Sequence, residues 1–138
     1  MARVIRFSVP FATPLLNQQQ GVHWSRLRNR RKAIAWQVKL AVLGQIPPQP
    51  FARARVTITR HSPGVPDTDN LWGGVKGLVD CLVAPGSPVV VKGKPRLPHP
   101  FGLGLVADDN PARMELVVRA EKCPRGQAKT EIVIEELI

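Results

Sequence analysis

Residues 53–60 (RARVTITR) alternate strictly between apolar and polar side chains, and this feature constrains the fold most. In an extended chain, Ala54, Val56 and Ile58 fall on one face, and arginines and threonines fall on the other. Such alternation predicts a strand in a half-buried antiparallel sheet. Other elements of the chain must therefore cover one face of that sheet.

The other periodic segments complete an order β-α-β-α-β-β. Further strands are expected at residues 3–9, 113–120 and 130–137, the last two as a hairpin. Helices are expected from Ser25, as N-cap, to about Leu43 and from Asp69 to about Val83, with a loop over residues 13–24. This order predicts a small α+β fold with a mixed sheet and helices packed on one face.

The length of 138 residues fits a single domain over residues 1–138. Proline and glycine are concentrated in residues 84–107, which we interpret as a long loop insertion. Short strand pieces are expected within it around residues 89–91 and 103–106.

Basic side chains are distributed unevenly along the chain. Residues 1–66 carry 11 of the 20 Lys and Arg residues and none of the 10 Asp and Glu residues, so the net charge of +10 arises there. This asymmetry indicates a polyanionic partner, for which nucleic acid is the obvious candidate. We expect phosphate contacts from the start of the first long helix and from the 84–107 loop. The DNA-binding candidates are Arg26, Arg28, Arg30, Arg31, Lys32, Lys92, Lys94 and Arg96.

Carboxylates gather after the alternating strand. Asp67 and Asp69 are one residue apart, which places both on the same side of an extended chain. They repel each other there, whereas a divalent cation between them turns the repulsion into a binding site. The later pair Asp108-Asp109 offers a third carboxylate, and an oxygen-rich set suits Mg²⁺. Alone, an Asp-Asp pair before Asn-Pro is typical of a turn.

The helix expected after Asp69 has a polar face. A helical wheel places Asp69, Lys76 and Asp80 in a row, with the apolar side chains, Trp72 among them, on the opposite face. The glycines near this row either leave it open to a substrate backbone or pack tightly against another element. These glycines are Gly73, Gly74 and Gly77.

The pattern DTDNL, then GG-x-K-x-x-x-D-x-L, then a later Asp-Asp before the final strands resembles the RusA-type Holliday junction resolvases. The resemblance covers about residues 67–83 and 106–110. It implies a small α+β homodimer that resolves four-way DNA junctions in recombination and repair by paired, Mg²⁺-dependent hydrolysis of phosphodiester bonds, with Mn²⁺ as a possible substitute. The chain would then be a cytoplasmic endonuclease of a bacterium or phage, located at the nucleoid when bound to DNA.

The resemblance also implies roles for individual residues. It makes Asp67, Asp69 and Asp109 both metal ligands and catalytic residues. Lys76 is the implied catalytic lysine, which would stabilise charge on the phosphoryl oxygens. The implied supporting residues are Asp80, one turn after that lysine, together with Asn70 and Asp108.

Two other functions stay open on the sequence. A non-catalytic module that binds branched or single-stranded DNA needs the same cations but leaves the clustered carboxylates unexplained. A metal-dependent phosphohydrolase of nucleotides needs the carboxylates but not the arginine-rich half.

Several classes of protein are not expected. No P-loop motif is present, so no nucleotide cofactor is expected. No apolar run approaches the ~20 residues of a membrane span, and the N-terminus lacks the apolar stretch of a signal peptide. Cys81 and Cys123 have no CxxC pattern and are expected to be reduced cytoplasmic thiols.

The histidines and tryptophans are assigned structural or peripheral roles. His23, His61 and His99 lack metal-ligand spacing and are expected in loops or facing DNA. Trp36 is expected on the core face of its helix. Trp24 is expected in a hydrophobic contact at the start of the helix, with stacking on an unpaired base as the alternative.

Overall fold

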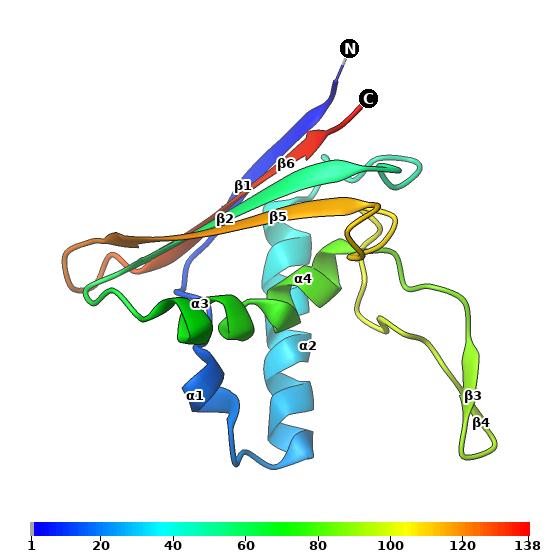
Figure 1. Cartoon of the computed structure of the whole chain (residues 1–138), viewed down its shortest axis with the longest axis horizontal. Coiled ribbons are helices and arrows are strands. Elements are labelled where there is room, and N and C mark those ends of the chain that lie inside the picture. The colour runs from blue at the N-terminus through cyan, green and yellow to red at the C-terminus, as the bar shows by residue number, and fades with distance from the viewer. Residues whose placement is uncertain (1) are drawn as a thin grey trace.

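A four-stranded sheet forms the centre of the fold in the computed structural model, which describes residues 2–138 (Figure 1). The strands are β1 (Val4–Val9), β2 (Ala54–Ser62), β5 (Met114–Lys122) and β6 (Lys129–Glu136). They lie in the order β1–β6–β2–β5, in which β6 is antiparallel to both neighbours and β5 is parallel to β2. The mixed sheet and its four strands are thus confirmed.

The predicted hairpin of residues 113–120 and 130–137 is wrong, because β2 lies between β5 and β6. At the end of β2, the backbone N–H of Cys123 donates to the carbonyl oxygen of Ser62 at 3.1 Å. The side chains of β2 explain its central place, since alternate residues are buried and Ile58 is fully so. The parallel pairing of β2 with β5 also departs from the antiparallel sheet that its alternation predicted.

The helices cover one face of the sheet (Figure 1). From this layer, α2 (Trp24–Ala41) contributes the fully buried Val38 to the core, and α4 (Lys76–Leu82) contributes the fully buried Leu82. The opposite face of the sheet carries charged and polar side chains such as Arg55. The α+β class with helices on one face is confirmed. Among residues 2–138, no helix has the length and apolar character that crossing a membrane requires.

The predicted loop over residues 13–24 contains a one-turn helix, α1 (Leu16–Gln19). The side-chain oxygen of Gln18 accepts a hydrogen bond from the backbone N–H of Leu15 at 3.0 Å, which stabilises the start of this turn. A single turn is too short to show an apolar period, and Leu15 is not a recognised capping residue. The sequence signals for this helix were therefore absent.

The boundaries of α2 differ slightly from the predicted ones. His23, and not Ser25, is the N-cap, and its Nδ1 accepts from the backbone N–H of Ser25 at 3.2 Å. Gly44 follows the helix with a φ of +86°, as a terminating glycine requires. The core position predicted for Trp36 is wrong: its side chain is 59% exposed, because the buried stripe of α2 runs through Ile34 instead.

The single helix predicted over residues 69–83 is two helices, α3 (Thr68–Gly74) and α4, which meet at Val75 and run in different directions (Figure 1). The N–H of Val75 donates to the carbonyl of Trp72, three residues back, after a pair of glycines that favours a kink. The wheel that aligned Asp69 with Asp80 assumed one straight helix and does not describe this arrangement. Trp72 is 42% exposed, so its predicted core position is wrong too.

The glycines at the kink have a packing role. A Cβ atom on Gly74 would overlap the backbone carbonyl oxygen of Pro14, and one on Gly73 would lie 2.9 Å from Cβ of Leu16. For these two positions the structure favours tight packing against α1 and the two residues before it over an open polar face. Gly77 differs, because its nearest neighbour would be a side-chain carbon of Arg31 at 3.5 Å, an ordinary contact distance.

Residues 84–107 form a projecting arm and a return segment. The arm consists of β3 (Val89–Val91) and β4 (Lys94–Arg96), which pair with each other and lie apart from the helices (Figure 1). The strand piece predicted at 89–91 is confirmed. At 103–106, only Val106 makes bridges, with Phe51 and Val83, and these fix the return segment to the core.

Candidate functional site

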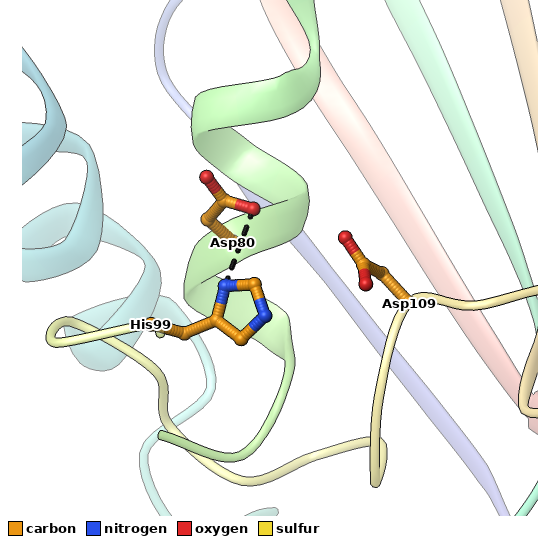
Figure 2. A group of neighbouring side chains, drawn as sticks. All are labelled: Asp80, His99 and Asp109. Atoms are coloured by element: carbon orange, nitrogen blue, oxygen red, sulfur yellow. Dashed lines mark ion pairs between the residues drawn. The ribbon is translucent and has the colours of Figure 1, made fainter. Parts of the chain in front are cut away.

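Three side chains converge where α4 meets the loops that follow the arm. One ligand atom each of Asp80, His99 and Asp109 lies within 4.8 Å of the others, and no other such group occurs in residues 2–138. Figure 2 shows the Asp109 carboxylate pointing toward Asp80 and His99. The Oδ1 atom of Asp80 is 3.4 Å from Nδ1 of His99. This group is called the Asp-His-Asp cluster below.

Backbone hydrogen bonds hold the loop of His99 against the end of α4. The N–H of His99 donates to the carbonyl of Pro85 at 3.0 Å, and the N–H of Leu103 donates to that of Cys81 at 2.9 Å. Two further bonds join Leu105 and Val106 to the carbonyl of Leu82. Because α4 is itself largely buried, these bonds place the His99 ring beside Asp80 on a rigid support.

Asp109 is positioned by a turn that Asp108 organises. The Oδ1 atom of Asp108 accepts from the backbone N–H of Asp109 at 2.8 Å, and its Oδ2 accepts from the side chain of Asn110 at 3.0 Å. The first of these bonds is the largest cause that lowers the pKa of Asp108. Asp108 therefore supports the turn, as predicted for an Asp-Asp pair before Asn-Pro, while the carboxylate of Asp109 is left exposed.

The environment of Asp80 disfavours its charge. Burial raises the pKa of this carboxyl, and Asp109 adds to the rise, against the opposing effect of His99, Arg31 and Lys76. Asp80 Oδ1 and His99 Nδ1 are both buried and lack a hydrogen-bond partner, since their 3.4 Å separation meets the ion-pair distance but not hydrogen-bond geometry. Two unsatisfied atoms of this kind are costly, and a bound cation would relieve the cost at Asp80.

The donor set of the cluster fits a divalent cation. Two carboxylates and one imidazole suit ions that accept both oxygen and nitrogen ligands, such as Mn²⁺ or Zn²⁺. Mg²⁺ prefers oxygen ligands and would use the two carboxylates with water and phosphate oxygens. The unpartnered Asp80 oxygen is the observation that supports this fit.

Asp67 and Asp69, which were predicted as metal ligands together with Asp109, lie at the start of α3 and outside the Asp-His-Asp cluster. Asp67 is the N-cap of α3, and its two oxygens accept from the backbone N–H and the side-chain amide of Asn70 at 2.9 and 3.1 Å. Asn70 in turn accepts from the N–H of Asn17, which ties α3 to α1 at 3.1 Å. Asp69 is exposed in the first turn of α3. Within residues 2–138, no group of three or more possible metal-ligand side chains contains Asp67 or Asp69.

Cations surround the cluster on two sides. Lys76 is exposed at the first position of α4, one turn before Asp80, and Arg31 approaches the same carboxylate from α2. Of the other cations in the first half of α2, Arg26, Arg28 and Lys32 are exposed, and Arg30 donates to the carbonyl of Gln18 at 3.2 Å. The remaining DNA-binding candidates, Lys92, Lys94 and Arg96, lie on the exposed arm.

No protein-family model matches this chain, and no curated protein matches its sequence. The site itself offers two carboxylates, an imidazole and the cations around them.

His99 is the residue of the cluster that the sequence did not single out. It was expected to be a loop or DNA-facing residue, and it does lie in a loop, but its ring is only 18% exposed and faces Asp80. Its contact with α4 arises from backbone bonds between residues 14 or more positions apart, for which no local spacing gives a signal. The prolines on both sides of His99 restrict its backbone and are the one local hint.

Proposed function

We propose that this chain is a metal-dependent endodeoxyribonuclease that resolves four-way DNA junctions, as the resemblance to the RusA-type resolvases implies. The observation that carries the proposal is the Asp-His-Asp cluster, in which Asp80 Oδ1 is buried without a hydrogen-bond partner next to Lys76 and Arg31. A metal site beside cations is a combination that suits metal-dependent hydrolysis of phosphodiester bonds.

Each group has a distinct task in this proposal. A divalent ion, Mg²⁺ or Mn²⁺, supplies activation of water and charge neutralisation at the scissile phosphate. Asp80 and Asp109 would hold it, with His99 as a further ligand for Mn²⁺, and Asp69 remains a candidate on the adjacent helix. Lys76 stabilises negative charge that develops on the phosphoryl oxygens.

The exposed cations of α2 hold DNA through its phosphates, which gives affinity without sequence readout. A four-way junction has approximate two-fold symmetry and needs two incisions, so a homodimer with two sites is part of the proposal. The protein would act in the cytoplasm, in DNA recombination and repair.

A non-catalytic module that binds branched DNA is the second candidate. One observation favours it: both oxygens of Asp67 are already used in capping α3, so this carboxylate has a structural role without any metal. The module would bind junctions through the same cations, and the Asp-His-Asp cluster would have no catalytic function.

Cleavage of a synthetic four-way junction separates the two candidates. The wild-type protein is compared with Asp69→Asn, with Mg²⁺, with Mn²⁺ and with EDTA, while binding is measured in parallel. The nuclease proposal predicts paired nicks in opposing strands that need the metal. Binding without any cut, over several junction sequences and both metals, would refute it in favour of the binding module. If Asp69→Asn cuts like the wild type, Asp69 is not a ligand, and the cluster alone carries the metal.

A further inference from the structure

An open pocket of about 250 Å³ lies directly beside the Asp-His-Asp cluster. Asp80 and His99 form part of its wall, and Gly77 of α4 leaves room between them and α2. Trp24 and Arg28 of α2 and Phe101 also line it. Most of the lining surface is apolar, although the pocket sits in a strongly basic region.

Two side chains of this pocket, Trp24 and Arg28, are exposed, whereas Phe101 also packs against the core. Trp24 is 69% exposed, so the hydrophobic contact predicted for it at the start of α2 is wrong, because His23 caps the helix and the indole stays outside the core. Arg28 and Arg31 follow Trp24 at positions i+4 and i+7, which places all three on one face of α2. The guanidinium carbon of Arg28 is 6.0 Å from the centre of the Phe101 ring, at the limit of a cation–π contact.

We propose that this pocket receives a single unpaired nucleobase of a DNA strand, stacked on Trp24 and bordered by Phe101. Arg28 and Arg31 would face the phosphates on either side of that nucleotide. The inference rests on the proposed function in so far as DNA is the substrate, and it adds the structural feature by which branched DNA is distinguished from a duplex.

The size and surface of the pocket favour this ligand. A volume of about 250 Å³ lies just below the ~300–1,000 Å³ of pockets that enclose drug-sized ligands, so it suits one planar ring system. Aromatic and arginine planes are the usual partners of unstacked bases. The base must be unpaired, because a base within a duplex is reachable only at an unstacking cost of a few kcal/mol.

The position of the pocket connects base binding with cleavage. Because Asp80 and His99 belong to both the pocket wall and the cluster, a strand whose base enters the pocket runs its backbone past the carboxylates. Branch points, flaps and bulges supply an unpaired nucleotide at low cost, whereas linear duplex does not. The pocket would therefore select the strand position that reaches the cluster.

Equilibrium binding in EDTA tests the pocket independently of any cleavage. The probes are two labelled DNAs of equal length and charge, a linear duplex in which 2-aminopurine is paired with thymine and the same duplex in which the 2-aminopurine lies unpaired opposite an abasic site. Trp24→Ala is compared with wild type and with Trp36→Ala, which removes another exposed tryptophan of α2 that does not line the pocket. Since base–aromatic stacking is worth ~1–3 kcal/mol per base, the loss corresponds to about fivefold to 150-fold in affinity.

The inference predicts that wild type and Trp36→Ala prefer the unpaired DNA and change its 2-aminopurine fluorescence on binding. Trp24→Ala should lose that preference and that fluorescence change while its affinity for duplex stays the same. Equal preference in all three proteins, or no preference in the wild type, would overturn the pocket. If the wild type shows no preference that depends on Trp24 but still cuts junctions with Mg²⁺, the nuclease proposal survives without the pocket. If the preference depends on Trp24 and no metal supports cleavage, the pocket stands and the nuclease proposal fails.

Discussion

The positive charge of Arg26 favours DNA binding but reduces the stability of α2. It is the third residue of α2, exposed and without an ion pair among residues 2–138, and the first turn of α2 contains no acidic residue. Its charge is therefore free for a phosphate. It also lies at the positive end of the helix dipole, where a cation is disfavoured by ~0.3–1 kcal/mol.

The substitution Arg26→Gln should consequently weaken DNA binding and stabilise the fold. Loss of one phosphate contact makes the slope of log K against log salt less negative by about 0.9, which is about a 3.5-fold effect between 50 and 200 mM salt. Loss of the unfavourable charge should raise the Tm by about 1–4 °C for a chain of this size. Fluorescence anisotropy over a salt series and thermal unfolding at low salt measure the two effects.

Lys39→Gln is the matched control in the same helix. Lys39 lies in the last turn of α2, where a cation is favourable, so its removal should lower the Tm and leave the salt slope almost unchanged. If Arg26→Gln keeps the wild-type slope, Arg26 does not contact phosphate. If Arg26→Gln also lowers the Tm, the argument that the cations at the start of α2 reduce stability and bind DNA phosphates is refuted.

Three further predictions concern the segment around α4. Gly74→Ala should destabilise the protein by about 1–3 kcal/mol or more, because the new methyl group would overlap backbone; Gly77→Ala should be neutral or stabilising by up to about 1 kcal/mol, and equal urea midpoints for the two variants would contradict the packing argument. Burial and the nearby charge of Asp80 raise the pKa of the Cys81 thiol to about 12. At pH 8 a thiol reagent should therefore modify Cys123 in the native protein and Cys81 only after unfolding, as counted by mass spectrometry. Rapid labelling of both cysteines in the native protein would contradict this prediction. Because the pKa of Asp80 is raised in the folded state, its ionised form lowers stability at neutral pH, and this penalty disappears as the pH falls below the ordinary value of 3.8. Asp80→Asn should therefore have a higher free energy of unfolding in urea than wild type at pH 7 in EDTA, and this difference should shrink in acid. A difference that does not change with pH would contradict the prediction.

Local patterns predicted most of the elements but not how they are joined. The alternation of Val56 and Ile58 is enough to predict a strand, because period two has a direct structural meaning. The place of β2 between β5 and β6 depends on which strand buries most apolar surface in the finished fold, which no local window contains. The kink at Val75 was hidden for a related reason: Leu71 and Leu78 are buried on either side of it, as in a straight helix.

The candidate site was predictable where it depends on neighbouring residues. Lys76 and Asp80 are four residues apart in one helix, so their proximity follows from helix geometry, as the pKa of Asp80 reflects. The turn at Asp108 likewise follows from local Asx chemistry. The contribution of His99 depends on a distant loop bonding to the end of α4, and the exposure of Trp24 depends on which face of α2 meets the sheet. Both become visible only when the chain is folded.

The most direct test of the central claim is single-turnover cleavage of a four-way junction by Asp109→Asn. Asp109 is the one residue shared by the ligand set that the resemblance implies and the Asp-His-Asp cluster that the structure contains. Glu115→Gln, which removes an exposed carboxylate paired with Arg55 on the open face of the sheet, is the control for charge. We predict that Asp109→Asn binds the junction as tightly as wild type in EDTA but loses the metal-dependent paired nicks, while Glu115→Gln keeps them. Two results would contradict a metal-dependent nuclease built on this cluster. One is that Asp109→Asn cleaves the junction as fast as wild type, and the other is that none of the three proteins cleaves it with Mg²⁺ or Mn²⁺.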